Sequence, residues 1–236
     1  MMAMGTLYGV GVGPGDPELI TVKAYRIMKE ADVIAYPKKR KGTKSYAFQI
    51  VEAYVDAGNK EMLGLAFPMT KDEDILTREW NAIVDQIFPY LQEGKDVAFV
   101  TEGDPMLYST FIHLQRLLNE RYPDIPIVSI PGVSSVNGAA SRLGIPLADG
   151  DEWMAIVPAT ADCEKMKQAL ETNDAIVFIK VAKVLGMMIE LLEELDLLDK
   201  ASVATKVTSK DEWIWRDIRE LRHAELEYLT LMIVKK

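Results

Sequence analysis

Short apolar runs alternate with longer segments of helical period through the first half of the chain. The runs predict five strands, at residues 6–11, 32–36, 62–67, 96–101 and 126–130. The segments between them predict helices at 18–30, 44–55, 72–93 and 107–121. Because strands that alternate with helices pair in parallel, the pattern indicates a mostly parallel α/β sheet with helices on its faces.

The second half of the chain follows a different order. Pro123, Pro126 and Pro131-Gly132 interrupt the pattern, and we place a domain boundary there, with domains at 1–130 and 131–236. Helices are expected at 134–142, 162–171 and 183–195, and strands at 153–157 and 175–180. Three strand candidates follow, at 201–207, 212–219 and 227–234. The fold class is therefore α/β, with a second domain whose mixed sheet closes in antiparallel strands.

Composition narrows the class of protein. The chain has 236 residues, 49% of them hydrophobic, which is enough for a substantial core. No apolar run reaches the roughly 18–20 residues that span a membrane, and no secretory leader is visible, so we expect a cytoplasmic protein. A single cysteine, Cys163, and only two histidines predict no disulfide framework and no metal site. A net charge of −9 argues against a nucleic-acid partner.

A glycine-rich loop near the start of the chain invites comparison with dinucleotide-binding loops. Residues 9–15 contain four glycines, yet the spacing G-x-G-x-x-G fails from either possible start. The second strand ends at residues 35–38 without the acid that binds a ribose. Asp16 moreover places negative charge where a phosphate would sit at a helix start. A ligand without phosphate, carrying positive charge, fits this loop better.

A second loop follows the 96–101 strand and contains Glu102, Gly103, Asp104 and Pro105. In one interpretation Asp104 caps the next helix and Pro105 takes its first position. In the other, Gly103 allows close backbone approach and the loop is a ligand cradle with a carboxylate at its lip, because ligands bind at the carboxyl ends of such strands. Both interpretations stay open on these residues alone.

One segment is strongly basic in an otherwise acidic chain. Residues 38–44 hold five positive charges, including Lys38, Lys39, Arg40 and Lys41. Such a run is often only solvated. Its position after the 32–36 strand, at the ligand-binding edge of the sheet, instead favours a partner with several carboxylates, held through charge-assisted hydrogen bonds.

Two further places carry polar side chains beside expected strand ends. Ser134 and Ser135 follow the 126–130 strand, where they either cap the next helix or bind a ligand between domains. Tyr108 is expected one turn into the helix after Asp104. Lys180 ends an apolar strand, a position typical of a lysine that extends its amine to solvent.

Residues 9–17, 102–105 and 131–135, in this order, resemble the tetrapyrrole methylase family of S-adenosylmethionine-dependent methyltransferases. The resemblance covers essentially the whole chain. Within the family, residues 36–39, 45–47, 107–111 and 228–231 are most similar to the C20-methyltransferases that act on precorrin-2 or cobalt-factor II in cobalamin biosynthesis.

The resemblance implies two α/β domains, a methyl donor in the cleft between them, a homodimer and no protein-bound metal. Carried over by motif, the residues expected to contact S-adenosylmethionine are Pro14, Gly103, Asp104, Leu107, Ser134 and Ser135. Positions outside a tight motif add Lys180, Val207, Leu229 and Thr230. The substrate implied is a reduced tetrapyrrole with eight carboxylates, which gives Lys38, Lys39, Arg40 and Lys41 a binding role. A proton must leave C20 after methylation, and the candidates to accept it are Asp104 and Tyr108, between which the sequence does not choose.

Several alternatives stay open at this stage. Within the family they are methylation of uroporphyrinogen III at C2 and C7, a later precorrin methylation, or diphthine synthesis on a protein. A different class is a nucleotide-binding α/β protein, against which the failed glycine spacing counts. A third is a non-catalytic partner that keeps the fold, against which the intact Gly-Asp-Pro loops count.

Overall fold

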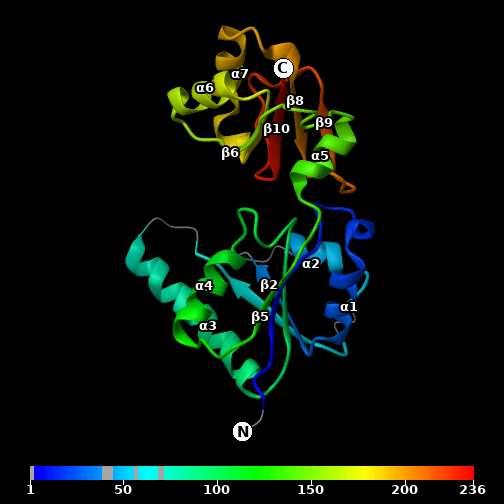
Figure 1. Cartoon of the computed structure of the whole chain (residues 1–236), viewed down its shortest axis with the longest axis vertical. Helices are drawn as coiled ribbons and strands as arrows, with labels where there is room; N and C mark the ends of the chain where they lie inside the picture. Colours follow the sequence, from blue (N-terminus) through cyan, green and yellow to red (C-terminus); the bar gives the residue numbers. More distant parts are fainter. Residues whose placement is uncertain (1–2, 39–44, 56–57, 69–71) are drawn as a thin grey trace. The chain divides into compact units, whose positions relative to one another are not determined.

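The computed structural model describes residues 3–38, 45–55, 58–68 and 72–236. The chain divides into two compact units, Met1–Ser134 and Ser135–Lys236 (Figure 1). Each unit is built on its own five-stranded sheet.

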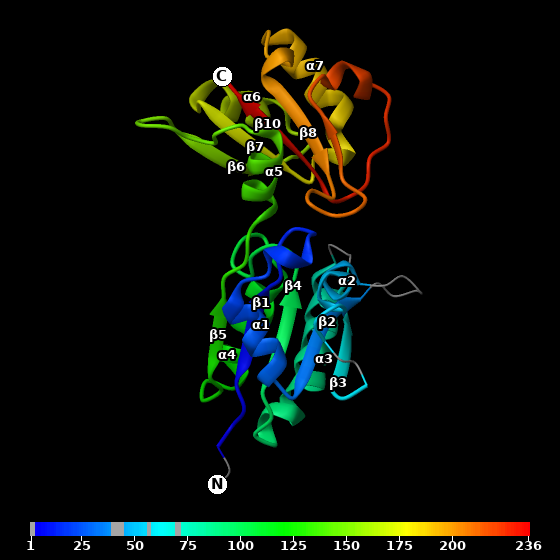
Figure 2. The ribbon, with the colours of Figure 1, turned by 90° about the vertical axis from the view of Figure 1, so that its right-hand side faces the viewer.

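The first unit contains a fully parallel sheet. Its strands are β1 (Leu7–Gly11), β2 (Val33–Lys38), β3 (Glu61–Ala66), β4 (Val97–Thr101) and β5 (Ile127–Ile130). They lie in the order β3-β2-β4-β1-β5, and every neighbouring pair is parallel (Figure 2). The five strands and the parallel sheet predicted from the sequence are confirmed.

Helices cover both faces of this sheet. They are α1 (Val22–Glu30), α2 (Tyr46–Val51), α3 (Glu73–Gln92) and α4 (Phe111–Arg121). Val97 and Phe99 of β4 belong to the core with α3 and α4, whereas Ala98 and Val100 belong to the core with α1 and α2. Because successive side chains of a strand point to opposite faces, a continuous apolar run is what a strand buried on both faces requires.

The helix predicted at 18–30 is interrupted. A short 3-10 helix, η1 (Pro17–Leu19), comes first, and Asp16 caps it by accepting the N–H of Glu18 at 2.9 Å. The chain is then extended at Ile20, and Thr21 caps α1 by accepting the N–H of Ala24 at 3.1 Å. The second cap starts a new helix because a threonine side chain satisfies a free N–H of the first turn.

The second unit holds a mixed sheet. Its strands are β6 (Met154–Pro158), β7 (Ala175–Ile179), β8 (Ala201–Thr205), β9 (Trp213–Trp215) and β10 (Thr230–Lys235). The order is β6-β7-β10-β8-β9, with β6 and β7 parallel and the other pairs antiparallel. The predicted mixed sheet with antiparallel closing strands is confirmed. The strand predicted at 212–219 is too long, because the chain turns at Asp217 into a 3-10 helix, η4 (Ile218–Leu221).

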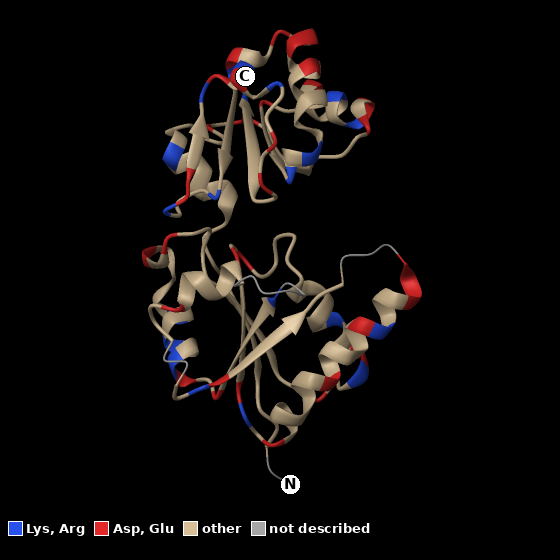
Figure 3. Ribbon diagram, turned by 180° about the vertical axis from the view of Figure 1, so that it is seen from behind, with Lys and Arg blue, Asp and Glu red and all other residues tan. Residues whose placement is uncertain are grey.

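The helices of the second unit are α5 (Ser135–Leu143), α6 (Cys163–Thr172) and α7 (Leu185–Glu194), with two further 3-10 helices, η2 (Val181–Val184) and η3 (Leu198–Lys200). Side chains of α6 and α7 pack on one face of the sheet in a single core that includes Phe178, Met188 and Met232. The strands carry almost no charged residues, and charge gathers on helices and loops instead (Figure 3). None of the described helices has the length and apolarity needed to cross a membrane.

Candidate functional site

Three loops of the first unit lie side by side at the carboxyl ends of adjacent strands. They follow β4, β1 and β5, which are neighbours in the sheet. Gly13 and Gly103 form an antiparallel bridge between the first two loops, with N–H to carbonyl distances of 2.8 and 3.4 Å. Both glycines have left-handed backbones, with φ of 83° and 65°, which residues with side chains rarely adopt. The two Gly-Asp-Pro loops recognised in the sequence are therefore joined directly through their backbones.

The three loops leave no room for side chains where they meet. A Cβ on Gly132 would lie 2.1 Å from the carbonyl oxygen of Gly103 and 2.8 Å from Cα of Gly11. A Cβ on Gly11 would lie 2.6 Å from that same oxygen and 2.6 Å from the nitrogen of Gly132. The neighbours are backbone atoms, which cannot rotate away. Glycine at positions 11 and 132 is therefore what allows the three loops to pack against one another.

Asp104 holds two of these loops together. Its Oδ1 accepts the N–H of Met106 at 2.8 Å, within its own loop. Its Oδ2 accepts the N–H of Gly132 at 3.0 Å, in the loop after β5. Hydrogen bonds from backbone N–H to a carboxylate are about twice as strong as neutral ones. The carboxylate is thus a cross-link between loops, which the sequence did not reveal.

The prediction that Asp104 caps the next helix, with Pro105 in its first position, is wrong. Helix α4 begins only at Phe111, and the side chain of Ser109 accepts its N–H at 3.2 Å. Tyr108 has a left-handed φ of 53°, so a right-handed helix does not run through it. Tyr108 therefore precedes the helix rather than lying one turn inside it, and its side chain is 47% exposed.

Helix α2 is hydrogen-bonded to both Gly-Asp-Pro loops. The hydroxyl of Tyr46 donates to the carbonyl oxygen of Pro14 at 3.3 Å. The carboxylate of Glu102 accepts the N–H of Ala47 at 3.2 Å. The sequence did not predict these contacts, although residues 45–47 and 102–105 both belong to the segments that carry the family resemblance. They fix the helix that follows the basic segment against the loops after β1 and β4.

The residues predicted to contact the methyl donor fall into two groups. In the first unit Pro14, Gly103, Asp104 and Leu107 lie in the loops just described. Ser134 ends that unit, and Ser135 begins α5 in the second. The remaining four lie in the second unit, at Lys180, Val207, Leu229 and Thr230.

Those four residues of the second unit lie close to one another, at the end of its sheet where β10 begins and β7 and β8 end. Strand β10 begins at Thr230 and runs antiparallel to β7 and β8, so its start lies beside their ends. Lys180 directly follows β7, and its Nζ lies 6.0 Å from the ring centroid of Tyr228. The Thr230 hydroxyl lies 2.7 Å from that of Thr205 and donates to the carbonyl of Glu227 at 2.6 Å. Sequence positions about 50 residues apart are thus brought together by strand pairing.

The basic segment is only partly described. Lys38 is exposed and ends β2 on the side of the sheet where the Gly-Asp-Pro loops follow β1 and β4, because all five strands are parallel. Lys39, Arg40 and Lys41 lie outside the described residues. Their predicted contacts with substrate carboxylates stay predictions.

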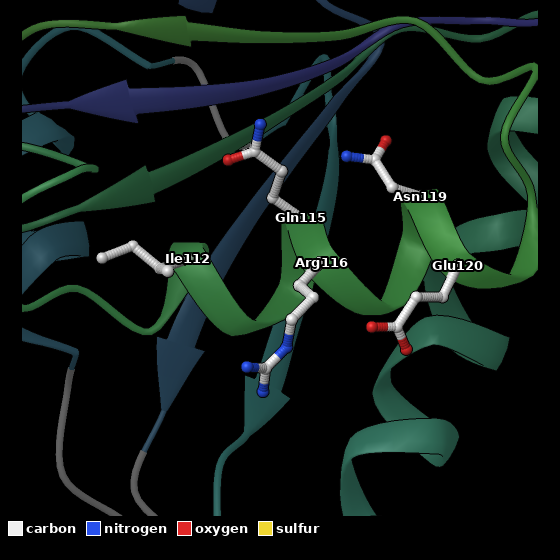
Figure 4. Close-up of a pocket in the computed structure, with 5 residues that line it drawn as sticks. All are labelled: Ile112, Gln115, Arg116, Asn119 and Glu120. Atoms are coloured by element: carbon white, nitrogen blue, oxygen red, sulfur yellow. The ribbon is translucent and has the colours of Figure 1, made fainter.

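A hollow of about 430 Å³ lies elsewhere on the surface, along α4 (Figure 4). It is lined by Ile112, Gln115, Arg116, Asn119 and Glu120. All five residues belong to one helix, and none belongs to the loops at the sheet edges. Within the described ranges, no group of three or more His, Cys, Asp or Glu side chains is placed to hold a metal ion.

The chain is thus a two-unit α/β protein. The first unit has a parallel sheet with backbone-lined loops at the carboxyl ends of its strands, and the second has a mixed sheet. The sequence profile of the Tetrapyrrole (Corrin/Porphyrin) Methylases matches residues 6–221, and the chain belongs to this family. The resemblance drawn from the sequence is confirmed.

Relatives match the chain along nearly its whole length. A probable cobalt-precorrin-2 C(20)-methyltransferase of Methanocaldococcus jannaschii is 36% identical, covering 98% of this chain and 96% of the relative. The cobalt-precorrin-2 C(20)-methyltransferase of Salmonella typhimurium is 34% identical, covering 98% and 97%. The precorrin-2 C(20)-methyltransferase of a Sinorhizobium species is 32% identical, covering 99% and 96%.

Solved structures share the fold. The uroporphyrin-III C-methyl transferase of Thermus thermophilus, complexed with S-adenyl homocysteine, aligns with a TM-score of 0.70 at 20% identity, covering 98% of each chain. The cobalt precorrin-4 methyltransferase CbiF aligns with a TM-score of 0.71 at 23% identity, covering 98% of this chain and 94% of that one. At these identities the likeness establishes the fold.

Proposed function

We propose that this chain transfers a methyl group from S-adenosylmethionine to C20 of precorrin-2 or cobalt-factor II, in cobalamin biosynthesis. The observation that carries the proposal is the set of C20-methyltransferase relatives, matched over at least 96% of their length at 32 to 36% identity. The glycine-lined loops of the first unit support methyl-donor binding, because they offer backbone groups and a carboxylate rather than a phosphate site.

S-adenosylmethionine, when bound, supplies an electrophilic methyl group on a sulfonium. Gly11 and Gly132 let the three loops pack backbone against backbone, which fixes the loops that carry Pro14, Gly103 and Asp104. We assign donor contacts to the predicted residues of both units: Pro14, Gly103, Asp104, Leu107, Ser134, Ser135, Lys180, Val207, Leu229 and Thr230. The task of these residues is to bind and orient the two reactants and to exclude water.

Asp104 has a positioning role in this proposal rather than that of a base. Both of its oxygens already accept backbone N–H bonds, and taking up a proton would weaken the link to Gly132. Tyr108, exposed beside it, is the remaining candidate to assist loss of the C20 proton. Replacing Tyr108 with Phe tests this: a base role requires a fall in kcat that depends on pH, whereas an unchanged kcat would remove Tyr108 from the chemistry.

We propose that Lys38, Lys39, Arg40 and Lys41 bind the carboxylates of the substrate. Lys38 lies at the carboxyl edge of the first sheet, and the other three follow it directly in the sequence. Changing all four to Glu should raise the KM for the tetrapyrrole and leave the Kd for S-adenosylhomocysteine unchanged. Lys23, exposed on α1, provides the control, because Lys23→Glu changes charge without touching the basic segment. Unaltered tetrapyrrole kinetics in the fourfold variant would defeat this assignment.

The function is tested by an anaerobic transfer assay with methyl-labelled S-adenosylmethionine. Precorrin-2 and cobalt-factor II are offered separately, followed by uroporphyrinogen III, a later precorrin and the protein substrate of diphthine synthesis. Label in either of the first two supports the proposal, and the preferred one identifies the pathway. Label only in one of the others would assign the chain to a different reaction of the family.

A homodimer in the cytoplasm completes the proposal. It follows from the family resemblance, and light scattering of the purified chain tests the assembly. A mass near twice 26.4 kDa is expected, and a monomer at micromolar concentration would contradict it.

A further inference from the structure

Val207 lies in a turn whose backbone is held in an unfavourable conformation on both sides. Its neighbours Lys206 and Thr208 have left-handed φ angles of 45° and 67°, and neither is a glycine. Such backbone conformations are unfavourable for residues with a side chain and persist only where surrounding contacts hold them. The contacts that hold this turn therefore decide where Val207 lies.

The main contact is the carboxylate of Glu212. Its Oε2 accepts the N–H of Thr208 at 2.6 Å, and both of its oxygens accept hydrogen bonds from Arg142. Nη2 of Arg142 lies 2.7 Å from Oε1, and Nε lies 2.9 Å from Oε1 and 3.1 Å from Oε2. The Glu212 side chain is only 10% exposed, whereas that of Arg142 is 56% exposed. Burial opposes the charge on Glu212, yet the hydrogen bonds from Arg142 and Thr208 outweigh it and lower the pKa of this carboxyl. A two-pronged pair of this kind fixes orientation as well as distance.

The same pair connects elements that carry proposed donor contacts. Arg142 stands in the last turn of α5, the helix that begins with Ser135. The turn is also joined to the segment that precedes β10, because the N–H of Lys206 donates to the carbonyl of Leu229 at 2.8 Å. The Lys206 amine also lies 2.7 Å from the carboxylate of Glu227. The turn that carries Val207 is thus joined to helix α5 through Glu212 and to Leu229 through the backbone of Lys206.

We infer that the Arg142–Glu212 pair is a positioning device for methyl-donor binding, which sets the backbone of the turn that carries Val207. Neither residue is among the proposed donor contacts, and their 70-residue separation explains why no sequence motif reveals the pair. The inference rests on the proposed function, because it assumes that Val207 and Leu229 contact the donor.

The experiment measures the Kd for S-adenosylhomocysteine by calorimetry, together with the thermal midpoint and kcat at saturating donor. Glu212→Ala should raise the Kd about tenfold or more, equivalent to about 1.4 kcal/mol, while kcat at saturation changes little. Arg142→Ala should raise it less, because Glu212 keeps its bond to Thr208. Glu194→Ala is the matched control, since it removes a 2.9 Å ion pair with Lys167 in the same unit, away from the turn.

Glu212→Gln is a second, milder variant that keeps the inference testable if Glu212→Ala does not fold. Its amide oxygen can still accept the N–H of Thr208 but loses the ionic partner of Arg142, so its Kd should fall between wild type and Glu212→Ala. Equal affinity in the wild type and in all three pair variants would overturn the inference while leaving the proposed function standing. An equal rise in Glu194→Ala would overturn it as well. Absence of binding in the wild type would overturn the proposed function and the inference together.

Discussion

Replacing Gly132 with Ala should disrupt the junction of the three loops in the first unit. The new Cβ would lie 2.1 Å from the carbonyl oxygen of Gly103 and 2.7 Å from the carbonyl carbon of Gly11. A Cβ essentially never lies within 3.0 Å of such an atom, and ordinary van der Waals contacts lie at 3.4–4 Å, so the loop after β5 must move by about 1 Å. That movement lengthens the bond from the N–H of Gly132 to Asp104, now 3.0 Å, beyond hydrogen-bonding distance.

The magnitude follows from these two effects. Forcing extra volume into a packed site costs about 1–3 kcal/mol, and losing a hydrogen bond to a charged group costs about 1.5–3 kcal/mol. The effects overlap, because movement that relieves the clash is what breaks the bond, so we expect about 3–5 kcal/mol. For a chain of this size that corresponds to a fall of roughly 6–20 °C in the thermal midpoint.

The assay is thermal unfolding monitored by scanning calorimetry, with and without S-adenosylhomocysteine. Gly186→Ala is the matched control: Gly186 lies in α7, and the nearest atom to a Cβ there is 3.9 Å away. Because alanine favours helices by about 1 kcal/mol over glycine, the control should be unchanged or slightly stabilised. A Gly132→Ala protein that unfolds at the wild-type temperature and binds S-adenosylhomocysteine equally well would refute the reasoning.

Three further predictions concern charged side chains. Asp104→Asn should weaken donor binding and lower stability by about 1–3 kcal/mol, because an amide accepts only one of the two backbone bonds; urea unfolding with parallel calorimetry measures both. Lys38→Glu alone should raise the tetrapyrrole KM without changing the Kd for the donor product, and steady-state kinetics checks it. The folded-state pKa of Glu212 is lowered by its bonds to Arg142 and Thr208, so its stabilising contribution is present above the unfolded pKa of about 4.3 and is lost as pH falls through the lower folded value. Urea unfolding from pH 6 to pH 3 should show a loss of stability that is smaller in Glu212→Gln.

The sequence predicted the strands well because each central strand is apolar on both faces. Strand β4, for example, is completely buried between two helical layers, and only a continuous apolar run satisfies that position. Helix starts were harder to predict. The Asp104-Pro105 pair has the local signature of a helix start, but the carboxylate bonds instead to Gly132, 28 residues away.

The same limit applies to the candidate sites. The Gly-Asp-Pro loops could be recognised because their residue types are unusual at strand ends, and the structure adds that their backbones touch. The Arg142–Glu212 pair carries no such signal, since arginine and glutamate are common on helices and in turns. Only the fold brings α5 beside the turn after β8. Long-range partners of ordinary residues are thus what the sequence alone does not supply.

The measurement that tests the central claim most directly is the position of the transferred methyl. Purified protein is incubated anaerobically with ¹³C-methyl S-adenosylmethionine and either precorrin-2 or cobalt-factor II, and the product is examined by NMR. The account predicts one new labelled methyl group, at C20. Label at another carbon, or no transfer to either tetrapyrrole by protein that binds S-adenosylhomocysteine, would contradict it.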